Sequence, residues 1–475
     1  MNKKLLFLPV LIVLLSGGCT MAPEYTQPEA PIPTNLPSWD ENENTQSTRE
    51  VQDIADISWR EFFTDQKLQQ IIETALKNNR DLRLAALNVE KVRALYGVQQ
   101  AELFPVVAVA GGGSRQQSSA DLTSTGNPRT TQQFNVDLGI TSWEIDFFGR
   151  IRSLEERALQ EYLATEEARR SAQIALISGV ARTYLTMAAD RENLKISRST
   201  LESQEGVYDL IRRQYETGIA TELDLRRSQI QVDVARRDIA RYTQLTARDW
   251  NALNLLAGAP VPEDLLPSDL ESVSTPRGIS PGLSSEVLLR RPDIIEAEDQ
   301  LKAAYAFIGA ARAAFFPRIS LTTFLGTASD ELSGLFKSGS GTWSFAPQIS
   351  LPIFDARTWA AYRVSQATQK IALARYEKTI QTAFKEVADA LAVRSTVEQQ
   401  VASQQAIVDS SEKVYRLSEM RYTEGIDSYL GVLVAQRSLF AAQQGLTYLQ
   451  LDRLANQVEL YAVLGGGGGP EERKE

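Results

Sequence analysis

The chain contains an internal duplication, and this feature constrains its fold more than any other. Residues 81–105 align without a gap on residues 293–317, a shift of 212 residues. The shared pairs are Asp81/Asp293, Ala85/Ala297, Gly97/Gly309 and Phe104-Pro105/Phe316-Pro317. A unit that repeats at about 210 residues predicts one body with internal pseudo-symmetry, not several unrelated domains.

Both copies have the same order of predicted elements. A helical run ends at Phe-Pro, two stretches of alternating polarity follow, and more than a hundred residues of nearly unbroken helical pattern come next. One chain therefore supplies four strands and about four long helices. The predicted fold class is mainly α, with two internal repeats per chain.

Two residue counts exclude most catalytic and metal chemistry. The chain of 475 residues has no histidine, the residue most used for acid–base catalysis near neutral pH and the commonest metal ligand. Its single cysteine permits no disulfide within the chain and no thiolate metal cage. The sequence also has no catalytic triad and no phosphate-binding glycine loop. We therefore expect no enzyme, no metal and no bound cofactor.

The single cysteine, Cys19, directly follows an export signal. A basic start, an apolar stretch and a small-residue cleavage site precede it, at Lys3-Lys4, residues 5–15 and Ser16-Gly17-Gly18. This order predicts a signal peptide over residues 1–18 and a covalent lipid on Cys19. The alternative is an ordinary signal peptide with an incidental cysteine.

Two neighbours of Cys19 bear on this prediction. Ser16 stands where the usual lipoprotein signal has leucine, whereas the leucine of this chain is Leu15. Residue 20 is threonine and not aspartate, and bacterial lipoprotein sorting then directs the chain to the outer membrane. The formal net charge is −10, or −12 without the two signal lysines, and no basic patch invites nucleic acid.

The strand candidates alternate apolar and polar residues. Phe134, Val136, Leu138 and Ile140 alternate with polar or small residues, and the second copy repeats the pattern. We expect hairpins at about residues 104–147 and 316–354, with loops at Ser114–Thr131 and Ala328–Gly341.

A soluble sandwich and a membrane barrel share this alternation. Aromatic residues of the kind found at membrane interfaces favour the barrel: Phe134, Trp143, Trp343 and Phe345. Beyond the signal, no stretch approaches eighteen consecutive apolar residues, so a bilayer could be spanned only by strands. Four strands are too few to close a barrel, which takes about eight, so several chains must contribute to one pore.

The helical pattern predicts two long hairpins. Residues 150–216 contain no proline, and a continuous helix there would extend about 100 Å at about 1.5 Å per residue. Apolar residues spaced three and four apart indicate coiled-coil packing. Gly218 and Gly425 stand at equivalent points where a left-handed helix end is expected, and Thr221 with Asp224 predicts a capping box. These points are two helix-hairpin tips.

Together these patterns divide the chain. The predicted segments are a signal peptide (1–18), a lipid-anchored tether (19–58), a first repeat that begins with a helical region over Trp59–Leu103 (59–257), an equatorial connecting segment (258–284), a second repeat (285–464) and a disordered tail (465–475).

Several segments resemble the outer-membrane factor family, the TolC-like channels, in its OprM-type lipoprotein branch. The resemblance covers residues 1–465. The segments are "GCTMAPEY" at Cys19, "WREFFTD" at Trp59, "NNRDLRLAALNVE" at Asn78, "WEIDFFGRIRS" at Trp143, "RRPDIIEAE" at Arg290, "IGAARAAFFPRISL" at Ile308 and "AVLGGG" at Ala462.

The resemblance implies a homotrimer with a twelve-stranded β-barrel in the outer membrane of a Gram-negative bacterium, continued by a long periplasmic α-helical barrel. It implies the passive exit duct of a tripartite RND multidrug efflux pump, with a periplasmic adaptor and an inner-membrane RND transporter as partners. Two alternatives stay open. One is the exit channel of a type I protein secretion system, and the other is a lipid-anchored coiled-coil scaffold that conducts nothing.

The resemblance also implies a periplasmic gate near the two tips. The matching positions are Tyr215, Thr217, Leu223, Asp224 and Arg227 in the first copy, and Tyr422, Tyr429, Leu430 and Arg437 in the second. Where close relatives place an aspartate near Arg437, this chain has Val434, which puts the salt-bridge part of the gate in doubt.

Two further roles are predicted at the tips. Asp224 and Asp427 could form carboxylate rings in an oligomer, or they could cap helix N-termini, which is the favoured interpretation for Asp427. The tip residues Gly218, Ile219, Gly425 and Ile426 could contact an adaptor, or they could be ordinary solvated turns.

Overall fold

The computed structural model describes residues 20–37, 57–278 and 284–467. The signal peptide, Cys19 and part of the predicted tether therefore lie outside the described residues. The chain divides into two compact units. Of the described residues, those within 1–29, 89–165 and 296–376 form unit 1, and those within 30–88, 166–295 and 377–475 form unit 2.

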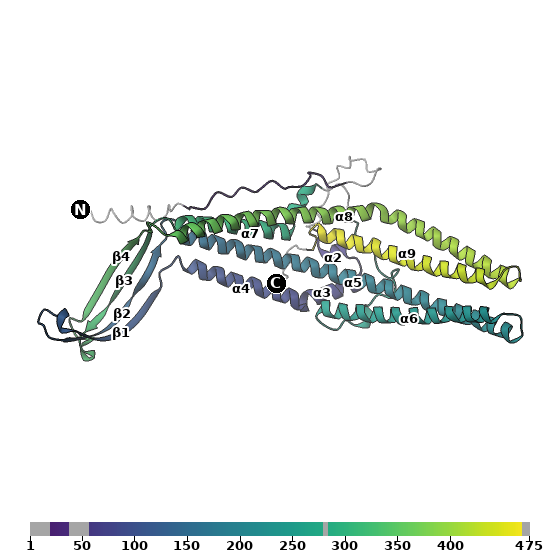
Figure 1. Ribbon diagram of the computed structural model, residues 1–475, viewed down its shortest axis with the longest axis horizontal. Helices are drawn as coiled ribbons and strands as arrows, with labels where there is room; N and C mark the ends of the chain where they lie inside the picture. Colours follow the sequence, from purple (N-terminus) through teal and green to yellow (C-terminus); the bar gives the residue numbers. More distant parts are fainter. Residues whose placement is uncertain (1–19, 38–56, 279–283, 468–475) are drawn as a thin grey trace. The chain divides into compact units, whose positions relative to one another are not determined.

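Unit 1 contains one antiparallel sheet of four strands, in the order β1-β2-β3-β4 (Figure 1). The strands are β1 (Val107–Ser118), β2 (Arg129–Ile145), β3 (Arg318–Ser329) and β4 (Gly341–Ser350). The two hairpins expected from the duplication are present, and the pairing of β2 with β3 joins them into one sheet.

The first strand loop is shorter than the sequence indicated. We expected a loop over Ser114–Thr131, but β1 continues to Ser118 and β2 begins at Arg129. Polar residues such as Arg115 pair across the two strands through their backbones. The apolar alternation ends before the backbone pairing does, because ladder hydrogen bonds do not depend on side-chain polarity.

Each row of paired residues places its side chains on one face of the sheet. One row joins Val109, Leu138, Leu325 and Trp343 across all four strands, and all four side chains are more than half exposed. The next row, on the opposite face, joins Ala110, Asp137, Gly326 and Thr342. The sheet therefore has an apolar face and a face of small and polar residues.

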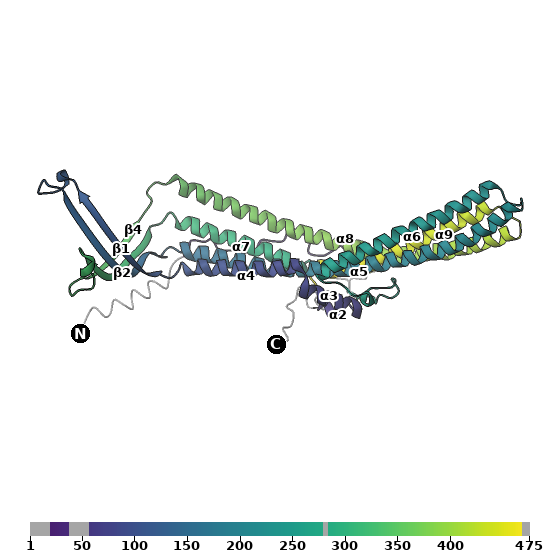
Figure 2. The ribbon, with the colours of Figure 1, turned by 90° about the horizontal axis from the view of Figure 1, so that it is seen from below.

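The helices that adjoin the strands in the sequence pack against one another in chain order. They are parts of α4 (Arg80–Ala101), α5 (Arg150–Glu216), α7 (Pro292–Ala313) and α8 (Ala356–Thr423), which Figure 2 shows from below. The ring of Tyr96 on α4 stacks on that of Tyr162 on α5. Arg157 on α5 lies over Phe307 on α7, and Arg312 on α7 lies over Tyr362 on α8.

Residues 21–25, at the start of the described part of the chain, are packed against α7 in unit 1. The phenol of Tyr25 donates to Glu298 over 3.0 Å, and Arg312 donates to the carbonyl of Met21 over 3.4 Å. A Cβ atom on Gly309 would lie 2.8 Å from the Cα of Ala22. The glycine therefore permits the close approach of this segment.

Unit 2 begins with helices that the sequence predicted as one region. Instead of a continuous helix over Trp59–Leu103, the structure has α2 (Trp59–Phe62), α3 (Gln66–Asn78) and α4. The carboxylate of Asp65 accepts from the amides of Lys67 and Leu68, and Asn79 accepts from Leu82. These caps begin α3 and α4, and so they divide the predicted region into separate helices.

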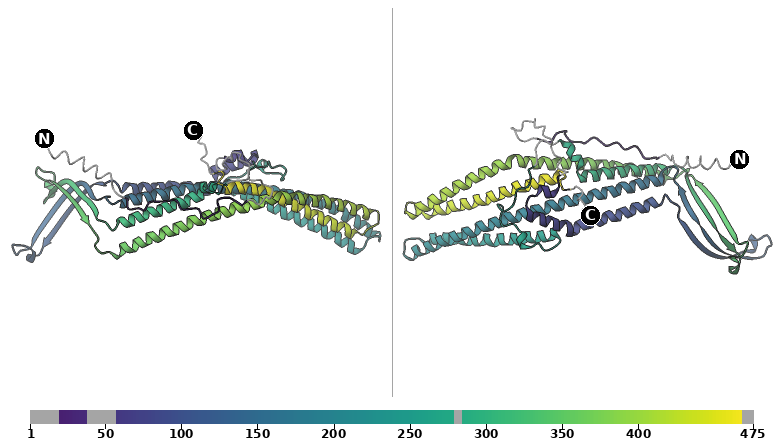
Figure 3. Two further views of the ribbon diagram at one scale, coloured as in Figure 1. Left: turned by 90° about the horizontal axis from the view of Figure 1, so that it is seen from above. Right: turned by 180° about the vertical axis from the view of Figure 1, so that it is seen from behind.

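The rest of unit 2 is dominated by two helical hairpins (Figure 3). One is formed by α5 and α6 (Glu222–Ala257), and the other by α8 and α9 (Tyr429–Val463). The bounds of α5 match the proline-free stretch in the sequence. Within the described ranges, none of the helices combines the length and apolarity that a membrane span requires.

The glycine-rich end is partly ordered, contrary to the expectation of a disordered tail from residue 465. Gly465, Gly466 and Gly467 are buried, and Gln173 donates to the carbonyl of Gly467 over 2.9 Å. A Cβ atom on Gly466 would lie 2.3 Å from the ring of Tyr461. The glycines are therefore needed for packing. Residues 468–475 lie outside the described part of the chain.

Candidate functional site at the hairpin tips

Both hairpins turn through a glycine with the predicted left-handed backbone. The φ angles are 81° at Gly218 and 72° at Gly425. The amide of Ile219 donates to the carbonyl of Gln214 over 2.8 Å, and the amide of Ile426 donates to that of Arg421 over 2.8 Å. These bonds complete a Schellman motif at each helix end. The predicted glycine turns are thus confirmed.

The two helices that follow the turns begin differently. At the start of α6, the amide of Asp224 donates to the Thr221 hydroxyl over 3.2 Å, and the amide of Thr221 donates to the Asp224 carboxylate over 3.4 Å. This is the predicted capping box. At the start of α9, the cap residue Ser428 makes no side-chain capping bond.

The expectation that Asp427 caps a helix is wrong. Its carboxylate forms an ion pair with Arg421 of α8, on the other side of the turn. The Arg421 guanidinium lowers the pKa of the Asp427 carboxyl below its usual value, chiefly through this hydrogen bond. The Nε–H of Arg421 thus binds this exposed carboxylate in place of a helix end.

A side-chain hydrogen bond joins the two hairpins near their tips. The phenol of Tyr422 on α8 donates to the side-chain oxygen of Gln214 on α5 over 2.9 Å. Burial raises the pKa of Tyr422, so the phenol keeps its proton and its role as donor. Gln214 was not among the residues predicted from the sequence. Its place four residues before Gly218 was the available signal.

An apolar cluster lies beside this hydrogen bond. It is composed of Ile211 from α5 and Tyr429, Val432 and Leu433 from α9, and the partly buried Tyr422 packs against it. The rings of Tyr422 and Tyr429 are 5.4 Å apart. The cluster draws residues from both hairpins, so a movement that separates them would expose it to water.

The structure brings only part of the predicted gate together. Tyr422 and Tyr429 meet in the cluster, whereas Tyr215, Leu223 and Leu430 are exposed. The Thr217 hydroxyl donates back to the carbonyl of Arg213 over 3.1 Å. Among the residues that the structure describes, Arg227 and Arg437 have no ion-pair partner, and Val434 is exposed near the latter on α9. The gating role of all the residues predicted for the gate stays a prediction.

Two half-buried carboxyl groups in unit 2 were missed by sequence reasoning. Asp190 on α5 and Asp249 on α6 lie beside each other. Burial raises the pKa of Asp249 to about 7, and the neighbouring Asp190 carboxyl adds to the rise. Below about pH 7 the pair therefore holds a proton. The residues are far apart in the sequence and belong to no motif, so no signal pointed to them.

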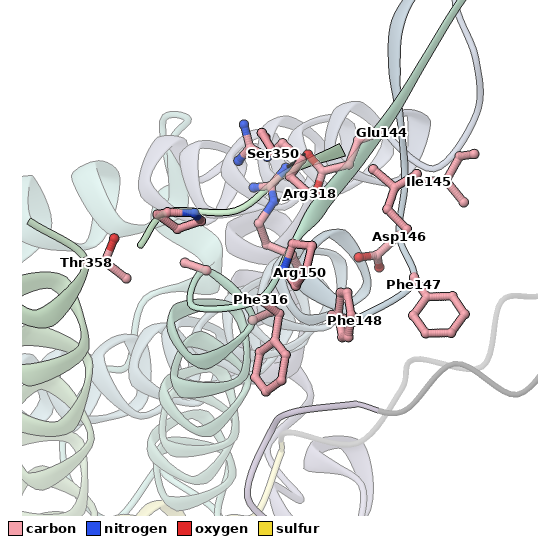
Figure 4. A pocket seen from close by; sticks show the side chains of 15 residues that line it. Glu144, Ile145, Asp146, Phe147, Phe148, Arg150, Phe316, Arg318, Ser350 and Thr358 are labelled. Atoms are coloured by element: carbon pink, nitrogen blue, oxygen red, sulfur yellow. Dashed lines mark hydrogen bonds and ion pairs between the residues drawn. The ribbon is translucent and has the colours of Figure 1, made fainter. Parts of the chain in front are cut away.

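A cavity of about 240 Å³ lies at the base of the sheet in unit 1 (Figure 4). Arg150 donates to both oxygens of Glu144, over 2.8 and 2.9 Å, and Arg318 lies 3.1 Å from the same carboxylate. The rings of Phe148 and Phe316 stack below these charges. All of these charges are paired, which is typical of a structural junction. Over the described ranges, no group of acidic or cysteine side chains could hold a metal ion.

Comparison with known proteins identifies the class of this fold. Residues 71–259 and 283–466 match the outer membrane efflux protein family. TtgC of Pseudomonas putida, named as a probable efflux pump outer membrane protein, is 47% identical over 98% of this chain and 96% of its own length. SilC of Salmonella typhimurium, named as a probable outer membrane lipoprotein, is 40% identical over 98% of this chain and 99% of its own.

Solved structures agree with these relatives. The MtrE outer membrane channel of Neisseria gonorrhoeae, solved in its open state, is 36% identical and has a TM-score of 0.82. The similarity covers 94% of this chain and 98% of that chain. The fold is thus that of the TolC-like outer membrane channels, a mainly helical class. The chain belongs to the outer membrane efflux protein family. The predicted family, outer membrane location and efflux role are confirmed.

Proposed function

We propose that three copies of this chain close a twelve-stranded barrel in the outer membrane, which a helical barrel continues into the periplasm. The supporting observation is the single sheet with two outer strands. Within the described residues, β1 and β4 each pair on one side only. Three sheets joined through these edges give twelve strands and leave no open edge, as a membrane requires.

The two faces of the sheet support this arrangement. The row of Val109, Leu138, Leu325 and Trp343 would face lipid, because such a continuous exposed apolar row is unfavourable in water. The face that carries Asp137 would line the water-filled interior. The lipid on Cys19 would add a second attachment to the membrane.

In this proposal the barrel is the passive exit duct of a tripartite pump. A periplasmic adaptor and an inner-membrane RND transporter would be its partners, and the transporter would supply the energy. Relatives in Pseudomonas putida are named as antibiotic, toluene and solvent efflux proteins, which supports small organic molecules as the cargo. The chain itself would make or break no bond and would need no cofactor.

The tips would form the periplasmic gate and the adaptor contact. The hydrogen bond from Tyr422 to Gln214 and the apolar cluster beside it would hold the two hairpins together in the closed state. The exposed Ile219 and Ile426 would offer an adaptor two apolar side chains beside glycine turns. The carboxylate of Asp224 in its capping box, and that of Asp427 paired with Arg421, are engaged locally, which favours structural roles for both.

Planar-bilayer recordings on the purified full-length protein test this function. We expect discrete single-channel steps from material that migrates as a heat-sensitive trimer. Restored drug resistance in a strain that lacks its own outer membrane efflux channel would support the pump assignment. A folded protein that yields no conductance would contradict the proposal and favour the scaffold alternative.

A further inference from the structure

Asp137 is the only charged residue near the middle of a strand in the sheet. It lies in the middle of β2, eight residues from each end. The other charged residues of the four strands are near strand ends: Arg115, Arg129, Glu144 and Arg318. In its row across the sheet, Asp137 is flanked by Ala110 on β1 and Gly326 on β3, with Thr342 beyond. None of these neighbours carries a charge.

The residues around Asp137 make room for its carboxylate and orient it. A Cβ atom on Gly326 would lie only 2.3 Å from Oδ1 of Asp137, so a larger residue could not stand beside it. The side-chain amide of Asn135, two residues earlier on the same face, donates to Oδ2. These contacts hold the carboxylate on the polar face.

The carboxylate keeps unused capacity to attract a cation. Its Oδ1 atom is buried and accepts no hydrogen bond, and no ion pair involves Asp137 among the described residues. A carboxylate whose oxygens are not all satisfied and whose charge is not neutralised calls for a solvated cation or water beside it. Arg150 and Arg318, which line the cavity at the sheet base, are already paired with Glu144.

We infer that Asp137 is a charge-selecting residue of the channel. This inference rests on the proposed trimer, in which threefold symmetry repeats the carboxylate three times around the water-filled interior at one level. A ring of negative charge at mid-barrel attracts cations and repels anions. Cationic solutes would therefore pass this level more readily than anionic ones of the same size.

The test is the reversal potential of the full-length channel in a KCl gradient across a planar bilayer. Asp137→Asn keeps the shape of the side chain and the contact with Asn135, and it removes the charge. We expect the K⁺/Cl⁻ permeability ratio to fall toward one, with single-channel steps still present. Asp137→Glu keeps the charge and is expected to retain the cation preference.

A matched control separates the ring from the general acidity of the chain. Asp121 is an exposed carboxylate in the short helix that connects β1 and β2, and Asp121→Asn removes one negative charge outside the strands. We expect this variant to keep the wild-type ratio. An Asp137→Asn channel with an unchanged ratio would overturn the inference and leave the proposed function intact. Absence of conductance from the folded wild-type protein would overturn both.

Discussion

The phenol of Tyr422 lies 2.9 Å from the side-chain oxygen of Gln214, and this hydrogen bond joins the two helical hairpins. Removing the hydroxyl leaves the amide oxygen without its donor and costs about 0.5 to 1.5 kcal/mol. In the proposed gate, Tyr422→Phe should therefore shift each chain about two- to tenfold toward the open state. Single-channel open times measure this shift.

Two further variants test whether the bond itself is responsible. Gln214→Ala in the Tyr422→Phe background should add little, because the two residues act as one pair. Tyr448→Phe removes an exposed phenol from α9, away from the tips, and should change nothing. Equal opening by Tyr448→Phe and Tyr422→Phe would contradict the account of the tip.

The unequal helix starts predict unequal effects of two cap substitutions. Thr221→Ala removes both bonds of the Thr221 hydroxyl in the capping box and should cost about 1 kcal/mol at the tip of the first hairpin. Ser428→Ala removes a side chain that makes no capping bond, so α9 should be unaffected. Hydrogen exchange at the first turns of α6 and α9 reports each effect, and similar losses at both starts would argue against the asymmetry.

The carboxyl pair of Asp190 and Asp249 predicts that stability falls as pH rises. The folded-state pKa of Asp249 is about 7, against an ordinary value of 3.8. Between these values the folded state binds more protons than the unfolded state, so stability declines with rising pH and is lowest above about 7. Asp249→Asn should flatten this decline, which melting curves at pH 5 and pH 8 would reveal.

The matched control for that prediction is Asp233→Asn, an exposed carboxylate on the same helix. It should leave the difference between the two pH values as it is in the wild type. The pair would have no part in the pH dependence if Asp249→Asn melted with the wild-type difference.

The duplicated glycines Gly97 and Gly309 should respond oppositely to alanine. A Cβ atom on Gly309 would lie 2.8 Å from the Cα of Ala22, and relieving the clash should cost about 1 to 3 kcal/mol. A Cβ atom on Gly97 would meet nothing within 4 Å, so Gly97→Ala should stabilise α4 by about 0.5 to 1 kcal/mol.

Thermal melting with limited proteolysis of residues 21–25 measures both effects. Gly309→Ala should expose the segment around Ala22 to protease, because that segment packs on α7. Equal stability of Gly309→Ala and Gly97→Ala would contradict the packing of the segment around Ala22 on α7.

The sequence predicted those parts of the fold that local patterns determine. The proline-free stretch gives α5 with its bounds, and Gly218 and Gly425 mark both turns, because only a left-handed backbone closes a helix in this way. The capping box at Thr221 is equally local. The duplication itself predicted the four strands, although not the pairing of β2 with β3 that unites them.

What sequence reasoning missed depends on contacts between distant residues. Asp427 pairs with Arg421 and does not cap a helix, because of side-chain geometry across the turn. Gln214 stands at a marked place before Gly218, but its partner Tyr422 belongs to the other hairpin, and local sequence does not reveal that pairing. The burial of Gly466 follows from the ring of Tyr461, and glycine composition alone indicates a loose tail.

The central claim is that one chain supplies a third of a closed membrane pore, and native mass spectrometry of the full-length protein released from detergent micelles tests it most directly. The account predicts a single dominant species with the mass of three lipid-modified chains. A species with the mass of one chain, from protein that is folded and extracted from the membrane, would contradict it.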